Sequence, residues 1–284
     1  MNFQKVGILG SGIMGSDIAE VAAAAGSLVV VRSRSQATAN AMLVGLEKSL
    51  AKQVEKEKRT AEEAQAIRTR VTATTSLADL AGCDFVIESV VEEISVKRAI
   101  FNELDRVVQH GAILATNTST LSVIELAMET SRPERVCGVH FFNPATVMSL
   151  VEIVRPLCTS DETIDAVTAF AQACGKEPVI VKDRAGFVVN ALLFPYLNNA
   201  VRLLEQGVAT MEGIDVAMKG GCGFPMGPFA LLDLVGLDTS LAILEALYGE
   251  YADPNFAPVP LLRRMVSAGQ LGRKSGRGFY DYRR

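Results

Sequence analysis

Several residue types are scarce in this 284-residue chain, and each scarcity narrows the possible functions. With only two histidines, few side chains are suited to acid–base chemistry near neutral pH. The five cysteines are far apart and form no CxxC pair, so the sequence predicts free thiols in a reducing compartment. We therefore expect no disulfide framework and no metal site.

Basic residues are not in excess, because 28 Lys and Arg face 32 Asp and Glu, giving a net charge of −4. This balance argues against a nucleic-acid partner. No apolar run reaches the roughly 20 residues needed to span a bilayer. The first residues show neither a signal-peptide nor a transit-peptide pattern. The sequence thus predicts a cytoplasmic protein with no nucleic-acid or membrane partner.

Short apolar segments alternate with helical stretches over the first two thirds of the chain, a pattern typical of an α/β sheet. Residues 36–70 have few helix breakers and predict two long helices with a break near residues 57–60. After residue 186 the sequence is helical, without a clear strand pattern. We predict a Rossmann-like doubly wound sheet over residues 1–185 with a helical insertion at about 36–70, and an all-α domain over 186–284.

A glycine loop lies between the first predicted strand and helix and fits the pattern G-x-G-x-x-G. In this context the glycines permit a tight turn, and the helix N-terminus offers N–H groups to a dinucleotide pyrophosphate. The alternative is a glycine-rich turn without a ligand. The cofactor-binding candidates here are Gly10, Ser11, Gly12, Ile13, Met14 and Gly15.

His140 ends a predicted strand, and Glu152 lies in the next one among apolar neighbours. If the segment between them is a hairpin loop, the two side chains face each other across the strands. A carboxylate on one imidazole nitrogen fixes the tautomer and prepares the other nitrogen to take a proton. A purely structural buried pair is the alternative.

Polar residues also follow the strand at 112–115 and mark the domain boundary. Asn117 and Ser119 belong to the first group, where both are also candidates for cofactor binding, and Asn190 belongs to the second. Such residues suit the orientation of a carbonyl or hydroxyl oxygen in a cleft, although each alone is an ordinary turn or cap residue.

The end of the second predicted strand bears on cofactor choice. NAD-binding sites of this fold carry an acidic residue there, but no Asp or Glu occurs between Glu20 and Glu47. Instead the strand ends in Arg32, Ser33 and Arg34, which suit a 2′-phosphate. We predict NADP(H) as the preferred cofactor and NAD(H) as a possible one; the alternative is a basic surface loop that tolerates either.

The segments GILGSGIMGSDIA, DFVIESVVE, ATNTSTL, GVHFFNPA, LVEIV, GFVVN, PMGPFALLDLVGLD and LGRKSGRGFYDY occur in order from residue 7 to residue 282. Together they resemble the 3-hydroxyacyl-CoA dehydrogenase family, in particular its short bacterial 3-hydroxybutyryl-CoA dehydrogenases. The resemblance implies His140 as catalytic base, Glu152 as its orienting partner, and Ser119 with Asn190 on the reacting substrate oxygen.

The resemblance also implies further contacts. Glu92, Lys97 and Asn143 match cofactor positions, and Lys52 and Lys56 match lysines that meet the CoA phosphates. Without the family, the two lysines are an i,i+4 pair on a solvated face.

Two positions depart from the family pattern. Ala191 stands where the family usually has Arg, which alters the local support of Asn190. Ser33 stands where many relatives have Asp.

The expected activity is hydride transfer between (3S)-3-hydroxybutanoyl-CoA and acetoacetyl-CoA, as in fatty acid and butanoate metabolism, by a homodimer. The alternatives are a CoA-independent hydroxy-acid dehydrogenase of the gulonate type and a non-catalytic, crystallin-like cofactor-binding protein.

Overall fold

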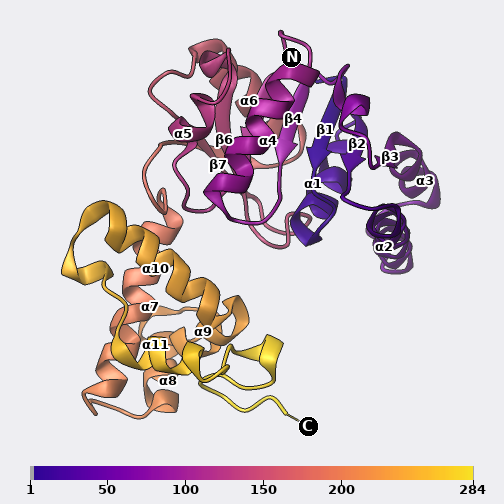
Figure 1. Cartoon of the computed structure of the whole chain (residues 1–284). Coiled ribbons are helices and arrows are strands. Elements are labelled where there is room, and N and C mark those ends of the chain that lie inside the picture. Colours follow the sequence, from indigo (N-terminus) through magenta and orange to yellow (C-terminus); the bar gives the residue numbers. More distant parts are fainter. Residues whose placement is uncertain (1–2, 284) are drawn as a thin grey trace. The chain divides into compact units, whose positions relative to one another are not determined.

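The computed structural model describes residues 3–283 and contains two compact units, one ending at Asp183 and the other beginning at Arg184 (Figure 1). The observed boundary follows Asp183, two residues before the boundary that the sequence predicts after residue 185. Among the described residues, none of the helices combines the length and the apolar character that a membrane crossing requires.

The first unit is built on an eight-stranded sheet in the order β3-β2-β1-β4-β5-β6-β7-β8. All neighbouring strands are parallel except β6 and β7, which are antiparallel. The predicted doubly wound, Rossmann-like sheet is therefore confirmed. The strands are β1 (Lys5–Leu9), β2 (Leu28–Arg32), β3 (Val71–Thr74), β4 (Phe85–Glu88), β5 (Ile113–Thr116), β6 (Val136–Phe141), β7 (Leu150–Arg155) and β8 (Glu177–Lys182).

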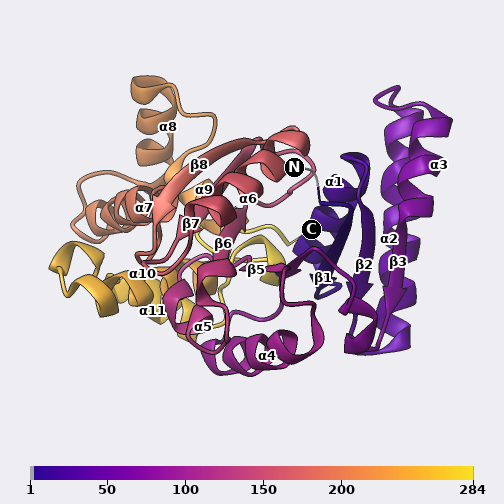
Figure 2. The ribbon, with the colours of Figure 1, turned by 90° about the horizontal axis from the view of Figure 1, so that it is seen from above.

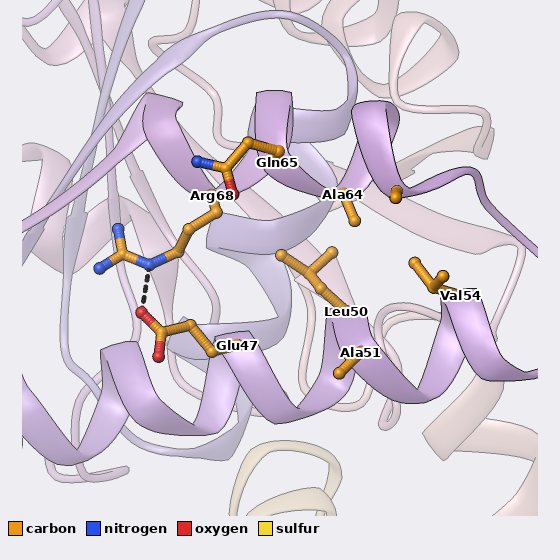
Figure 3. Close-up of a pocket in the computed structure, with 8 residues that line it drawn as sticks. Glu47, Leu50, Ala51, Val54, Ala64, Gln65 and Arg68 are labelled. Atoms are coloured by element: carbon orange, nitrogen blue, oxygen red, sulfur yellow. Dashed lines mark hydrogen bonds and ion pairs between the residues drawn. The ribbon is translucent and has the colours of Figure 1, made fainter.

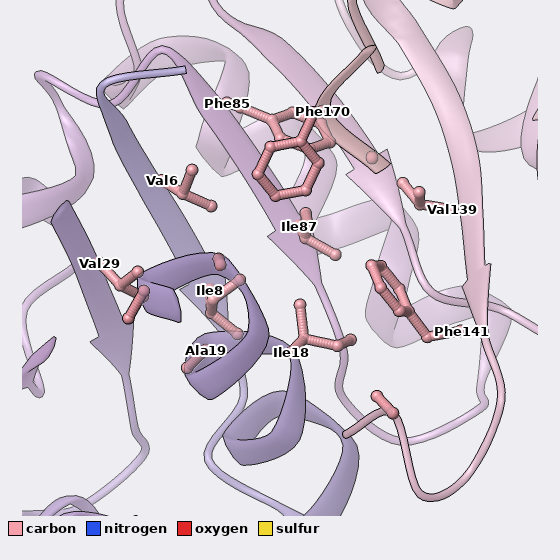
Figure 4. Close-up of a cluster of buried hydrophobic side chains, with 14 of the residues drawn as sticks. Val6, Ile8, Ile18, Ala19, Val29, Phe85, Ile87, Val139, Phe141 and Phe170 are labelled. Carbon is pink, nitrogen blue, oxygen red and sulfur yellow. The ribbon is translucent and has the colours of Figure 1, made fainter. Parts of the chain in front are cut away.

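Helices cover both faces of this sheet (Figure 2). α1 (Ile13–Ala24) and α6 (Asp161–Ala173) lie on one face, and α4 (Ile94–Val107) and α5 (Val123–Ala127) on the other. Every second residue of the strands faces α1 and α6, because side chains alternate along a strand. Val6, Ile87 and Phe170 belong to the resulting apolar core (Figure 4).

The helical insertion is a hairpin of α2 (Gln36–Glu55) and α3 (Ala61–Arg70), with the break where the sequence predicts it. Each helix begins with a capping box, formed by Ser35 with Thr38 and by Thr60 with Glu63. The hairpin is fastened to α1 by the buried Glu20 carboxylate, which accepts hydrogen bonds from α2.

The second unit is helical, as predicted, and its described residues form only isolated bridges instead of strands. A separate apolar core holds the helices together. Buried Asp215 caps α9 by accepting the N–H groups of Phe229 and Ala230, and the Tyr280 hydroxyl donates to the same carboxylate. The helices are α7 (Val189–Glu205), α8 (Met211–Cys222), α9 (Pro228–Val235), α10 (Leu237–Tyr251) and α11 (Pro260–Ser267).

Candidate active site

His140 and Glu152 lie directly opposite each other on the antiparallel strands β6 and β7. The His140 Nδ1 and a Glu152 carboxylate oxygen are 2.7 Å apart, and both residues are buried, with 6% and 1% of their surfaces exposed. The cross-strand pair predicted from the sequence is therefore present. A buried carboxylate next to Nδ1 favours the tautomer with its proton on that nitrogen, and it stabilises a protonated ring.

The loop after β5 is tied to the end of β6 beside His140. The Asn117 side chain accepts the N–H of Phe141 at 2.9 Å and donates to the Ser89 hydroxyl at 3.3 Å. Asn117 thus joins the carboxyl ends of three strands. Ser119 lies two residues further on, and its N–H donates to the Glu92 carboxylate at 2.7 Å.

Glu92 and Lys97 belong to one ionic group with Glu88, the last residue of β4. Lys97 is fully buried, and its ammonium group contacts the buried Glu88 carboxylate on one side and the partly exposed Glu92 carboxylate on the other. Glu88 was not among the candidates selected from sequence, although a carboxylate that closes the otherwise apolar strand segment FVIE was a usable signal.

The glycine loop fits a dinucleotide diphosphate. A Cβ atom on Gly10 would lie 2.2 Å from the Ser89 carbonyl oxygen, and one on Gly15 would lie 2.1 Å from the Gly10 carbonyl oxygen. Gly12, in contrast, faces open space: apart from its adjoining backbone, no atom of the described residues lies within 4 Å of the position of a Cβ. Helix α1 starts there without a side-chain cap or an acidic residue in its first turn. The N-terminal N–H groups of α1 can therefore serve an anion.

At the end of β2, the structure adds one feature that the sequence did not predict, the environment of the Ser33 hydroxyl. Ser33 is buried, and its hydroxyl contacts those of Ser11 at 2.6 Å and Thr38 at 2.5 Å. The serine hydroxyl is thus engaged in an internal chain of hydroxyl groups. Arg34 is exposed, and the Nε of Arg32 is a buried donor without a hydrogen-bond partner in the part of the chain that the structure describes.

The predicted CoA-binding lysines lie at the end of α2, and both are exposed. A hollow of about 310 Å³ between α2 and α3 lies nearby, lined by apolar residues such as Leu50 and Val54 (Figure 3). Glu47 and Arg68 form a 2.8 Å ion pair at the same hollow. Neither Lys52 nor Lys56 lines it. The hollow is therefore part of the contact between α2 and α3 and is separate from the predicted CoA-binding lysines.

The two remaining candidates, Asn143 and Asn190, belong to different units of the structure. Asn143 is exposed in the turn between β6 and β7. Asn190 belongs to the second unit, where it is the second residue of α7. Ala191 follows it in the first turn of the same helix, at the position where the family pattern has Arg.

Two family models match nearly the whole chain. The model of the 3-hydroxyacyl-CoA dehydrogenase NAD-binding domain matches residues 5–184, and that of the 3-hydroxyacyl-CoA dehydrogenase C-terminal domain matches residues 186–282. Both models cover the part of the chain that contains their respective candidate residues.

Individual relatives agree with these models. The chain is 48% identical to a 3-hydroxybutyryl-CoA dehydrogenase of Mycobacterium tuberculosis over 98% of both chains. It is 45% identical to a probable 3-hydroxybutyryl-CoA dehydrogenase of Bacillus subtilis, over 99% of this chain and 98% of that one. It also resembles the crystal structure of the (S)-3-hydroxybutyryl-CoA dehydrogenase PaaH1 from Ralstonia eutropha, with a TM-score of 0.97, 44% identity and full coverage of both chains.

Proposed function

The chain belongs to the 3-hydroxyacyl-CoA dehydrogenase family, and we propose that this enzyme interconverts (3S)-3-hydroxybutanoyl-CoA and acetoacetyl-CoA. The observation that carries the proposal is the buried His140–Glu152 pair at 2.7 Å, beside the carboxyl ends of the parallel strands. Ligands of open α/β sheets bind at these ends. The names of the relatives support the four-carbon acyl-CoA as substrate.

In the oxidative direction His140 takes the proton of the C3 hydroxyl while C3 loses its hydride. Glu152 holds the imidazole in place and stabilises its protonated form. Ser119 and Asn190 bind the C3 oxygen and stabilise the charge that develops on it. The nicotinamide cofactor, when bound, supplies the hydride acceptor.

The glycine loop and the first turn of α1 would hold the cofactor diphosphate. Gly12 leaves open space for the phosphate groups, and the N–H groups at the start of α1 have no side-chain cap and can donate to them. We propose a preference for NADP(H). No carboxylate is present at the end of β2 to repel a 2′-phosphate. Arg34 is exposed there, and Arg32 carries an unsatisfied buried donor. Ser33 contributes mainly by its lack of charge, because its hydroxyl is already engaged.

The test is a spectrophotometric assay of acetoacetyl-CoA reduction with NADPH and with NADH. We expect kcat/KM to be higher with NADPH, and we expect Ser33→Asp combined with Arg34→Ile to reverse the order. Equal or better efficiency with NADH in the unmodified protein refutes the preference alone. Turnover of free hydroxy acids without turnover of acetoacetyl-CoA refutes the substrate and favours a gulonate-type dehydrogenase.

The two domains have separate roles in this proposal. The N-terminal domain binds the cofactor, and Lys52 and Lys56 at the end of α2 meet the CoA phosphates. The C-terminal domain helps to bind substrate and forms a homodimer, since α7 and α8 carry exposed apolar residues such as Leu192 and Val216. Light scattering at micromolar concentration should give twice the chain mass of 30.4 kDa, and a monomer contradicts the dimer.

A further inference from the structure

A buried ionic group joins β4 to α4 at the carboxyl edge of the sheet. Glu88 and Lys97 have fully buried side chains, and the Lys97 Nζ lies 2.7 Å from the Glu88 Oε1. The same ammonium group lies 3.3 Å from the Glu92 Oε2. Glu92 is the outer member of the group, with 38% of its side chain exposed.

Glu88 is fully engaged by hydrogen bonds on both oxygens. Besides Lys97, its Oε1 accepts the N–H of Val90 at 2.6 Å, and its Oε2 accepts the Thr116 hydroxyl at 2.8 Å. Burial of such an ion pair adds little to stability compared with apolar side chains of similar volume. Stability alone is therefore a poor explanation for charges at this place.

The outer carboxylate fixes the loop that carries Ser119. The Glu92 Oε1 accepts the Thr118 hydroxyl at 2.5 Å and the N–H of Ser119 at 2.7 Å. The Thr118 hydroxyl in turn accepts the N–H of Leu121 at 2.9 Å, which closes the turn. A continuous path of contacts thus runs from Glu88 through Lys97 and Glu92 to the backbone of Ser119.

We propose that Glu88 is a positioning residue that acts through Lys97 and Glu92 on Ser119. Glu88 holds the Lys97 ammonium group inside the protein, Lys97 holds the Glu92 carboxylate, and Glu92 holds the Ser119 amide. In this fold, dinucleotides bind across the carboxyl ends of the strands, at the point between β1 and β4 where the strand order reverses. The path from Glu88 to Ser119 ends at this edge of the sheet, where cofactor and substrate are expected to meet. The effect on catalysis rests on the proposed role of Ser119, whereas the effect on the Ser119 amide does not.

A second ion pair on α4 provides a matched control. Asp105 lies 2.9 Å from the Nε of Arg132, and the Arg132 guanidinium group also donates to backbone carbonyl groups of Asp105 and Val108. This pair joins the C-terminal half of α4 to the segment before β6, and its hydrogen bonds within the described residues go to Ser131 and to the end of α4 and the segment after it, away from the candidate residues. Asp105→Asn therefore shows what a weakened ion pair on α4 does to the protein when the path from Glu88 to Ser119 is left intact.

The first experiment is amide hydrogen exchange on the protein without ligands, read at the peptide that contains Ser119. We expect Glu88→Gln and Glu92→Gln each to speed exchange of the Ser119 amide by about tenfold or more, because its acceptor is no longer held. Asp105→Asn should leave this amide unchanged. Unchanged exchange at Ser119 in Glu88→Gln overturns the proposal. If Glu88→Gln does not fold, Glu88→Asp, which keeps the charge but withdraws the carboxylate, must show the same faster exchange.

The second experiment is a double-mutant cycle on kcat/KM with acetoacetyl-CoA. We expect Glu88→Gln to lower kcat/KM on the order of 10–100-fold, which is the usual effect of a misplaced site residue. In the Glu92→Gln background the same change should add less than about twofold, because both act on one path. Losses that multiply overturn the proposal, as does an equal loss in Asp105→Asn. If the unmodified enzyme does not turn over acetoacetyl-CoA, the substrate proposal fails and the exchange experiment still decides the role of Glu88.

Discussion

Replacement of Glu152 by Gln tests the proposed catalytic pair of His140 and Glu152 most directly, because it removes one charge and leaves the shape nearly unchanged. The two side chains are buried and 2.7 Å apart at their nearest atoms, so their charge centres are roughly 4 Å apart. At an effective dielectric constant of about 20, two unit charges at this separation attract by about 4 kcal/mol. This is the stabilisation of the protonated imidazole that a neutral amide at position 152 cannot supply. We expect kcat to fall on the order of 10³-fold.

The assay is the absorbance of the reduced nicotinamide cofactor during reduction of acetoacetyl-CoA, with enzyme concentration corrected for folded protein. Glu177→Gln is the matched control, because it makes the same change on the neighbouring strand β8, where the side chain is exposed. That variant should retain normal turnover. If Glu152→Gln keeps kcat within about threefold of the unmodified enzyme, the electrostatic reasoning is wrong and the pair is structural.

Three further changes have specific expected outcomes. His140→Ala should lower kcat by about 10²–10⁴-fold while the cofactor dissociation constant, measured by fluorescence of the reduced nicotinamide, changes little; near-normal turnover contradicts the role of a base. Gly15→Ala should destabilise the fold by about 1–3 kcal/mol in denaturant unfolding, because the new Cβ would lie 2.1 Å from the Gly10 carbonyl oxygen, whereas Gly12→Ala should fold normally and weaken cofactor binding. Burial raises the pKa of Asp105, but hydrogen bonds from Ser131 and Arg132 outweigh this and hold it below its ordinary value. The resulting stability is present above the unfolded-state pKa of about 3.9 and is lost as the pH falls through the folded pKa, so Asp105→Asn should flatten the acid decline of the unfolding free energy; an unchanged decline contradicts this.

Most of the sheet could be predicted from sequence, because its strands are short apolar runs separated by amphipathic helices. The short segment FVIE, for example, coincides with strand β4, Phe85–Glu88. The pairing of His140 with Glu152 was also predictable, since the hairpin turn places them equally far from its centre. The five-residue helix α5 was not, because it is too short to show a helical period.

The parts of the site that escaped prediction depend on contacts between distant segments. Glu88 and Lys97 are nine positions apart and come from different elements, so no local pattern reveals their ion pair. The sequence places Ser33 among the residues that suit a 2′-phosphate, but its contacts with Ser11 and Thr38 arise only when the glycine loop meets the end of β2. The tertiary fold decides which partners a buried polar side chain meets. The helical or strand periodicity of apolar residues carries no information about those partners.

The antiparallel hairpin of β6 and β7 has a consequence for how this enzyme can diverge. His140 and Glu152 meet only in the present register, and successive side chains of a strand point to opposite faces. An inserted or deleted residue that the connecting turn does not absorb shifts the register by one and turns Glu152 away from the imidazole. Exposed side chains of residues 142–149 other than the cofactor candidate Asn143 can therefore change during evolution more easily than buried Ala145, while the number of residues between the two catalytic candidates is under much stricter selection. Relatives of this enzyme should therefore differ at this turn by substitution far more often than by single-residue insertion or deletion.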